Sequence, residues 1–108
     1  MSVTTVLLDA GGVLLDEAAW ERTRAEATAE VLRAHVPGYT TAQYDADIEE
    51  AVRTYCPRAY HFVFWRHLGP DRDLYHQALA AFEVLWRPRR PPMRLMAGIG
   101  DELPRLAA

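Results

Sequence analysis

Lysine is absent from this sequence, and all 12 of its basic residues are arginines. Any site that depends on a lysine amine is therefore excluded within these residues. Cysteine is nearly absent as well, because Cys56 is the only one, so no disulfide forms within the chain. We expect its thiol to be buried or half-buried in a reducing, cytoplasmic environment.

Long apolar runs and an excess of positive charge are also missing. No apolar run approaches the roughly 20 residues that span a bilayer. The N-terminus has no basic start before a longer apolar segment, so we expect neither a membrane helix nor a signal peptide. The formal charge of −3 at pH 7 argues against a nucleic-acid partner, because phosphate binding favours a basic face. The 108 residues, half of them hydrophobic, are typical of one soluble globular domain.

Sequence that predicts strands is scarce, and the one clear candidate is Val3–Leu8. This apolar run ends on Asp9 and is followed by Gly11 and Gly12. We interpret it as a buried strand that stops in a tight turn. Asp9 then lies at the carboxyl end of the strand, where open α/β sheets bind their ligands. A carboxylate in that place is a candidate nucleophile.

Helical patterns account for most of the remaining chain, with four helices between residues 17 and 87 and the start of a fifth after residue 97. The first helix is predicted by a periodic stretch at 17–34, and the second by a Thr40–Gln43 capping box before an apolar stripe of Tyr44, Ile48, Val52 and Tyr55. The aromatic stretch at 58–68 predicts the third helix, and a cap at Asp71 or Asp73 with a stop at Pro88 predicts the fourth. The fifth is predicted by the helical spacing of Ile99, Leu103 and Leu106, with Pro104 inside the pattern.

A complete fold seldom contains just one strand. Its backbone donors and acceptors are unpaired unless strands lie on both edges. The neighbours must come from sequence beyond these residues, from another chain, or from a strand that the pattern conceals.

Residues 9–14, which read Asp-Ala-Gly-Gly-Val-Leu, resemble the first motif of the haloacid dehalogenase-like (HAD) superfamily of hydrolases. In that family an apolar strand is followed by Asp-x-Asp-Gly-Thr/Val-Leu, and a helical cap is inserted before the second strand of a Rossmann-like core. The resemblance implies an α/β fold, of which this chain would form a mostly helical part with an incomplete core. Residues 1–16 would be the first strand and nucleophile loop, 17–87 the helical cap, and 88–108 the return linker and the start of a core helix.

The resemblance also implies hydrolysis through a covalent aspartyl intermediate. Asp9 matches the family's nucleophile and one ligand of its Mg²⁺ ion, and the backbone carbonyl of Gly11 matches a second ligand. Gly11 and Gly12 would let the backbone approach the substrate closely. The implied parent activity is Mg²⁺-dependent hydrolysis of a small phosphorylated metabolite.

The chain departs from the family pattern in ways that lower its expected activity. Gly11 stands where the phosphatases have a second Asp, a general acid and base whose help is typically worth about 10²–10⁴-fold. The family's later Ser/Thr, Lys and acidic-pair motifs do not occur in these residues, so we expect the isolated chain to be inactive. Hydrolysis of a halo-acid is an alternative, because dehalogenases also lack the second acid. Their Asp-Ala-x-Gly-Thr-Leu-x-Asp pattern shares Asp9, Ala10, Gly12, Leu14 and Asp16 with this chain.

Other polar and aromatic residues have ordinary structural interpretations. We expect Asp16 to cap the first helix. The acidic residues Asp45, Asp47, Glu49 and Glu50 predict a solvated helix face. The aromatic residues Tyr60, Phe62, Phe64, Trp65 and Trp86 either line a substrate entrance or pack between helices. The histidines His35, His61, His67 and His76 lack the spacing of a zinc site.

A third hypothesis belongs to a different class of function. The chain would be a non-catalytic helical interaction module in which the aspartate motif is a relic. Two copies would then form a homodimer that completes the sheet. Measuring the mass in solution distinguishes such a dimer from an aggregating fragment.

Overall fold

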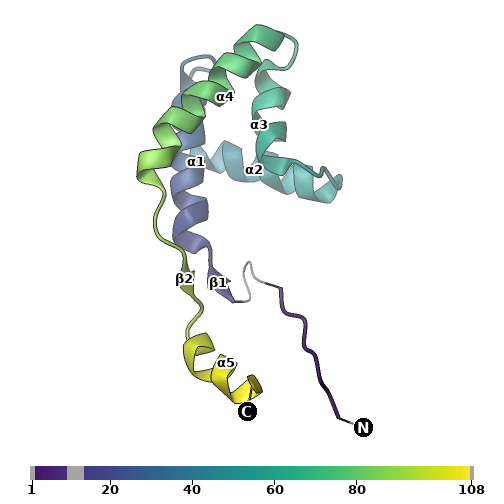
Figure 1. Ribbon diagram of the computed structural model, residues 1–108. Coiled ribbons are helices and arrows are strands. Elements are labelled where there is room, and N and C mark those ends of the chain that lie inside the picture. Colours follow the sequence, from purple (N-terminus) through teal and green to yellow (C-terminus); the bar gives the residue numbers. More distant parts are fainter. Residues whose placement is uncertain (1, 10–13, 108) are drawn as a thin grey trace. The chain divides into compact units, whose positions relative to one another are not determined.

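The computed structural model describes residues 2–9 and 14–107 (Figure 1). Within them the chain is mostly helical, with one small two-stranded sheet. The elements are, in chain order, β1 (Leu15–Asp16), α1 (Ala18–Arg33), α2 (Thr41–Arg53), α3 (Ala59–Leu68), α4 (Arg72–Trp86), the 3-10 helix η1 (Arg87–Arg89), β2 (Arg94–Leu95) and α5 (Ile99–Ala107). Among the described residues, no helix has both the length and the apolar character needed to span a bilayer.

The chain divides into two compact units. One consists of Met1–Glu21 with Pro91–Ala108, and the other, which we call the helical unit, is Arg22–Arg90. The helical unit contains most of α1 and all of α2, α3, α4 and η1.

The predicted strand at Val3–Leu8 is wrong. Residues 2–9 have no regular secondary structure, and their apolar side chains are exposed, Val3 by 80% and Leu7 by 93%. A strand that is buried on both faces needs neighbouring strands, and none pairs with this segment in the described part of the chain. The α/β architecture implied by the family resemblance is therefore not supported by the described residues.

The sheet instead pairs the segments that lead into and out of the helical unit. β1 and β2 are antiparallel, with Leu15 opposite Leu95 and Asp16 opposite Arg94 (Figure 1). The backbone N–H of Met96 also donates to the carbonyl of Leu14, over 2.8 Å. The sequence does not predict these strands, because two residues per strand carry no detectable periodicity.

The helices begin close to the predicted places. Asp16 Oδ1 accepts the backbone N–H of Ala18 over 3.0 Å and so caps the start of α1. The capping box at Thr40 and Gln43 is present in full. Asp71, the first of the two predicted caps, accepts the N–H of Leu74 over 3.0 Å. These caps satisfy donors that have no partner inside the helix. α5 also forms, and Pro104 lies within it.

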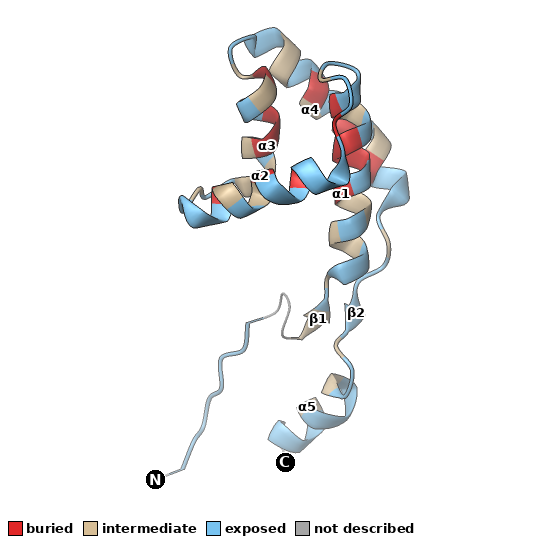
Figure 2. Cartoon of the chain, turned by 180° about the vertical axis from the view of Figure 1, so that it is seen from behind, coloured by how far each residue is buried: buried red, intermediate tan, exposed pale blue. Residues whose placement is uncertain are grey.

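The core of the helical unit lies where α1, α3 and α4 face one another (Figure 2). Phe64 and Phe82 meet edge to face with ring centroids 5.6 Å apart, and Phe82 stacks on Trp86 at 5.9 Å. Each large apolar side chain buried in this way contributes about 1.5–3 kcal/mol. Phe64 and Trp86 are therefore core residues, whereas Trp65 stays 59% exposed.

The buried face of α2 differs from the predicted apolar stripe. Tyr44 is buried as expected, but Val52 is 64% exposed and Tyr55 is 92% exposed. Asp47 and Ala51 take their place on the buried face. The prediction of Asp47 as a solvated acid is therefore wrong, and the reason lies in the polar contacts described below.

Candidate functional site

The candidate nucleophile Asp9 lies at the end of the irregular segment 2–9, and its side chain is exposed. It does not follow a strand, so the predicted placement at a sheet edge is wrong. Gly11 and Gly12, the predicted substrate-binding residues, lie outside the described residues, as does the Gly11 carbonyl predicted to bind Mg²⁺.

The described residues do not form a magnesium site by themselves. Mg²⁺ requires a nearly octahedral set of oxygen ligands. Within residues 2–9 and 14–107, no group of three or more His, Cys, Asp or Glu side chains is placed to hold a metal ion. Asp9 offers a single carboxylate, and one donor group does not make a complete site.

A small pocket of about 340 Å³ lies beside the paired strands β1 and β2. Asp16 on β1 and Arg94 on β2 both line it, together with Ala19, Pro91 and Pro92. Asp16 therefore caps α1, lies opposite Arg94 in the sheet and borders this pocket. The pairing fixes the two ends of the intervening chain beside each other.

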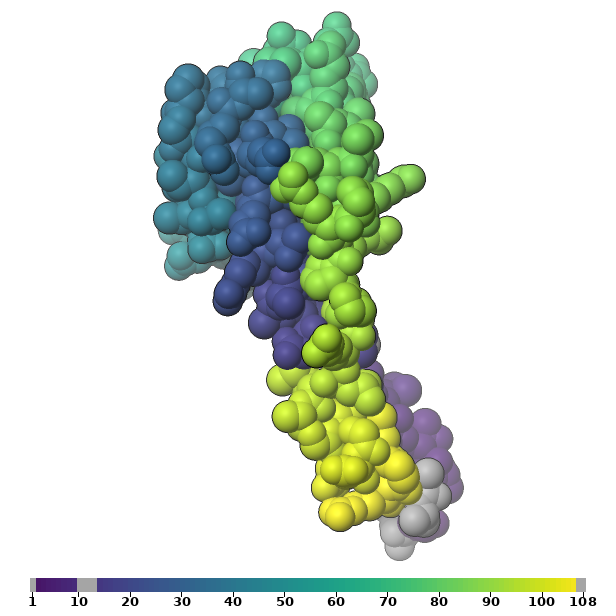
Figure 3. Space-filling model, turned by 90° about the vertical axis from the view of Figure 1, so that its left-hand side faces the viewer, coloured from purple at the N-terminus to yellow at the C-terminus, as the bar shows by residue number. Residues whose placement is uncertain are grey.

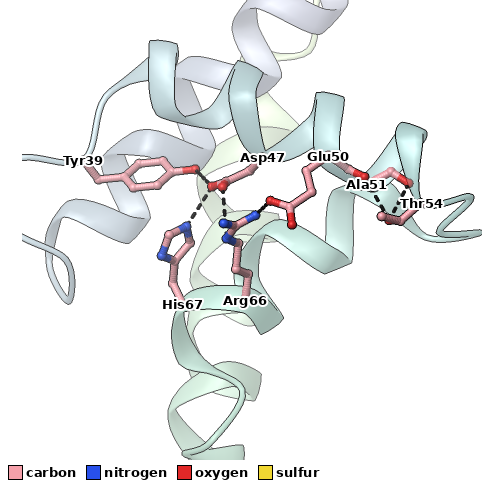
Figure 4. A network of polar contacts seen from close by, with 7 residues as sticks. All are labelled: Tyr39, Asp47, Glu50, Ala51, Thr54, Arg66 and His67. Carbon is pink, nitrogen blue, oxygen red and sulfur yellow. Dashed lines mark hydrogen bonds and ion pairs between the residues drawn. The ribbon is translucent and has the colours of Figure 1, made fainter.

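A network of polar side chains, which the sequence does not reveal, surrounds the buried Asp47 and Tyr39 in the helical unit (Figure 4). Asp47 Oδ2 accepts the Tyr39 hydroxyl over 2.6 Å and lies 2.7 Å from His67 Nε2. Arg66 Nε lies 3.4 Å from Asp47 Oδ1, and the guanidinium of Arg66 also forms an ion pair with Glu50. These three side chains replace the hydrogen bonds to water that the carboxylate loses when it is buried.

The network joins the loop before α2 to α2 and α3. Burial raises the pKa of the Tyr39 hydroxyl well above its ordinary value of 10.0, and the hydrogen bond and negative charge of Asp47 raise it further. Because an ionised carboxylate only accepts hydrogen bonds, we place a proton on Nε2 of His67. The arrangement fastens the loop before α2, α2 itself and α3 together.

Arg24 of α1 lies among aromatic rings from α3 and α4. Its Cζ atom is 3.9 Å from the ring centre of Tyr60, 5.0 Å from that of Phe82 and 5.6 Å from that of Trp86. A guanidinium held over rings is attracted by their negative faces. Tyr60 therefore contacts a cation, in addition to the helix packing expected of the aromatic residues.

A pocket of about 250 Å³, which we call the Arg24 pocket, lies beside this cation. It is lined by Arg24, Pro57, Arg58, Tyr60 and His61. A second pocket of about 220 Å³ shares Arg58 and His61 with it. We call this the aromatic pocket, because its other lining residues are Cys56, Phe62, Trp65 and Tyr75.

A larger, shallow groove of about 700 Å³ runs between α1 and α4, which lie side by side on the face shown in Figure 3. Its lining is mainly apolar and includes Val31, Ala81 and Val84. Arg89 and Glu30 form an ion pair at 2.7 Å on its border. The hydrogen bond from Arg89 lowers the pKa of the Glu30 carboxyl.

Sequence reasoning missed Asp47 for an identifiable reason. Asp47 lies three residues after Tyr44 and four before Ala51, which is the spacing of a buried helix face. Its negative charge nevertheless led to the prediction that it lies on a solvated face. For Arg24 there was no signal, because its rings come from two helices distant in sequence. Comparison of the chain with protein-family models, with curated proteins and with solved structures found no match to any of them.

Proposed function

We propose that this chain supplies the nucleophile Asp9 and an inserted helical cap to a HAD-like hydrolase of the cytoplasm. Its substrate would be a small phosphorylated metabolite, and its cofactor would be Mg²⁺. The proposal starts from the resemblance of residues 9–14 to the family's first motif.

One structural observation supports this proposal more than any other. The antiparallel pairing of β1 with β2 brings together Asp16 and Arg94, the residues that flank the long helical stretch of the chain. The first paired strand follows the Asp9 loop closely in sequence, and the second leads into α5. A helical insert directly after the nucleophile loop is the arrangement that the resemblance implies.

The chemistry would use the exposed carboxylate of Asp9. One of its oxygens attacks phosphorus and forms an acyl phosphate while the bond from phosphorus to the alcohol oxygen breaks, and the leaving oxygen takes a proton from water. A second water then hydrolyses the acyl phosphate, which releases inorganic phosphate and regenerates the carboxylate. Because the chain contains no lysine, any lysine of the site would belong to protein outside these residues. Asp9 would likewise contribute only one of the oxygen ligands that Mg²⁺ requires.

The proposal is tested on the gene product as the cell makes it. We expect Mg²⁺-dependent release of phosphate from p-nitrophenyl phosphate, which falls to the uncatalysed rate in the variant Asp9→Asn. Asp45→Asn, which changes an exposed acid on α2, is the matched control and should keep full activity.

Three other outcomes have distinct meanings. Release of halide from a 2-halo-acid, with no release of phosphate, would identify the dehalogenase reaction instead. An unchanged rate in Asp9→Asn would exclude Asp9 as the nucleophile. No activity combined with a stable dimer would favour the non-catalytic interaction module.

A further inference from the structure

We propose that the pocket beside the paired strands β1 and β2, which we call the strand pocket, binds a free α-amino acid with a small apolar side chain. The ammonium group of the amino acid would contact Asp16, and its carboxylate would contact Arg94. Asp9 takes no part in this binding, so the site is independent of the proposed hydrolysis.

The register of the sheet places two opposite charges at the strand pocket. Asp16 on β1 lies opposite Arg94 on β2, and both are exposed residues that line the pocket. Directly opposite residues of an antiparallel pair project from the same face, with Cβ atoms about 4.5–5.5 Å apart. A molecule that carries an ammonium group and a carboxylate on one carbon can therefore contact both side chains.

Both charged side chains keep capacity for a ligand. Asp16 Oδ1 accepts the backbone N–H of Ala18, and an ionised carboxylate has a second oxygen that accepts further hydrogen bonds. Within residues 2–9 and 14–107, no ion pair joins Asp16 to Arg94, and the guanidinium of Arg94 has no hydrogen bond or ion pair. That guanidinium is therefore available to bind a carboxylate through paired N–H donors.

The balance of charge in the lining favours a zwitterion over a simple anion or cation. The five described lining residues include one carboxylate and one guanidinium, so their charges cancel. A ligand with a single charged group would contact only one of them and would lose one charge-assisted hydrogen bond. An amino acid carries both charges at neutral pH.

The rest of the lining determines the side chain of the amino acid. Ala19, Pro91 and Pro92 present apolar surface to the strand pocket. The two proline rings fix the backbone angle φ, so these walls need little further ordering when a ligand binds. A volume of about 340 Å³ is close to the lower limit of typical ligand sites, about 300 Å³. The pocket therefore suits a small aliphatic side chain.

The test titrates the ¹⁵N-labelled gene product, at pH 7 and constant ionic strength, with L-valine and with two analogues that each lack one charge. The analogue 3-methylbutanoate has no ammonium group, and 2-methylpropylamine has no carboxylate. We expect saturable shifts of the backbone amide signals of Asp16 and Arg94 with L-valine. Each analogue should bind about tenfold more weakly, because it loses one charge-assisted contact. Glycine, which has no side chain, should also bind more weakly than L-valine.

Two variants assign each group of the ligand to its partner. Asp16→Asn keeps a good cap for α1 but loses the negative charge, so it should bind L-valine and 3-methylbutanoate equally. Arg94→Gln should bind L-valine and 2-methylpropylamine equally. Arg90→Gln is the matched control, because Arg90 is an exposed arginine that does not line the strand pocket. It should bind L-valine as tightly as the wild type does.

The outcomes also separate this site from the proposed hydrolysis. Asp9→Asn should bind L-valine as the wild type does, whatever its effect on the release of phosphate. Shifts that never saturate, or equal affinities of the wild type for L-valine and either analogue, would overturn the zwitterion site. A loss in Arg90→Gln or Asp9→Asn equal to that in Arg94→Gln would overturn its location. Equal affinities for L-valine and glycine would overturn the apolar side chain.

Discussion

The carboxylate of Asp47 is buried and contacts three polar side chains of the helical unit. An isolated buried charge is strongly destabilising, whereas one that accepts several hydrogen bonds is not. Tyr39 and His67 both donate to one of its oxygens, and Arg66 approaches the other. The carboxylate therefore persists in the interior because the fold brings donors to it from the loop before α2 and from α3.

The raised pKa of Tyr39 predicts a loss of stability in alkaline solution. The ordinary pKa of a tyrosine hydroxyl is 10.0. At a pH above this value the unfolded chain releases the proton of Tyr39, whereas the folded chain keeps it. The contribution to the free energy of unfolding is therefore fully present below that pH and is lost as the pH rises above it. Between about pH 8 and about pH 11 we expect an extra loss of roughly 1 kcal/mol relative to Tyr39→Phe.

Urea unfolding at the two pH values measures this difference. Tyr55→Phe is the matched control, because Tyr55 is 92% exposed and should lose as much stability as the wild type. If Tyr39→Phe loses as much as the wild type over the same range, the hydroxyl of Tyr39 does not hold its proton as described.

At the scale of elements, the sequence predicted helix ends well and strands poorly. Caps such as Thr40 with Gln43 act over three residues, so the information lies in the local sequence. Each of β1 and β2 is stabilised by the other, which lies almost 80 residues away in the chain. The local sequence around one strand does not predict so distant a partner. The aromatic stretch at 58–68 was assigned correctly to a helix because its flanking stop signals are also local.

The residue that follows the C-cap of α2, Tyr55, has a backbone conformation that is unfavourable for a residue with a side chain. The N–H of Cys56 donates to the carbonyl of Ala51, and that of Tyr55 donates to Val52, which is a Schellman ending. Tyr55 has a φ of +57°, in the left-handed region where glycine is normally found at this position. Its ring is exposed and gains little from packing.

We expect Tyr55→Gly to raise the free energy of unfolding by about 0.5–1 kcal/mol, because the left-handed strain is removed at little packing cost. Thermal unfolding followed by circular dichroism measures the change. Tyr55→Ala is the matched control: it removes the same ring, keeps a Cβ at positive φ and should give no gain. A gain in Tyr55→Ala equal to that of Tyr55→Gly would show that the ring, and not the backbone, is unfavourable.

For the whole molecule, the exposed apolar segment at residues 2–9 dominates the expected behaviour in solution. Val3 is 80% exposed and Leu7 is 93% exposed, and segment 2–9 has no strand partner among the described residues. Unpaired backbone with apolar side chains promotes association with other chains. We expect a mass above that of the monomer, rising with concentration, in size-exclusion chromatography with light scattering.

The variant Leu7→Glu should shift that distribution toward the monomer without changing the helical content. Val84→Glu is the control, because it places the same charge on another exposed apolar side chain, in the groove between α1 and α4. If Val84→Glu reduces the mass and Leu7→Glu does not, the groove and not the N-terminal segment mediates association.

The candidate site was less predictable than the helices. Asp9 was identified from a motif, and motifs report on chemistry without fixing where the chain places it. Its assumed position followed from a strand at Val3–Leu8, and the described segment has no sheet to join. The cation among aromatic rings at Arg24 depends on packing between distant helices, which no local pattern encodes.

The register of β1 and β2 has a consequence for how this architecture tolerates change. Asp16 and Arg94 lie opposite each other in an antiparallel pair, and a turn of about two residues is enough to connect such strands. Everything between them therefore occupies the position of a hairpin loop. A domain of quite different size could be grafted between the same two residues, by evolution or by design, and the flanking chain would keep its alignment.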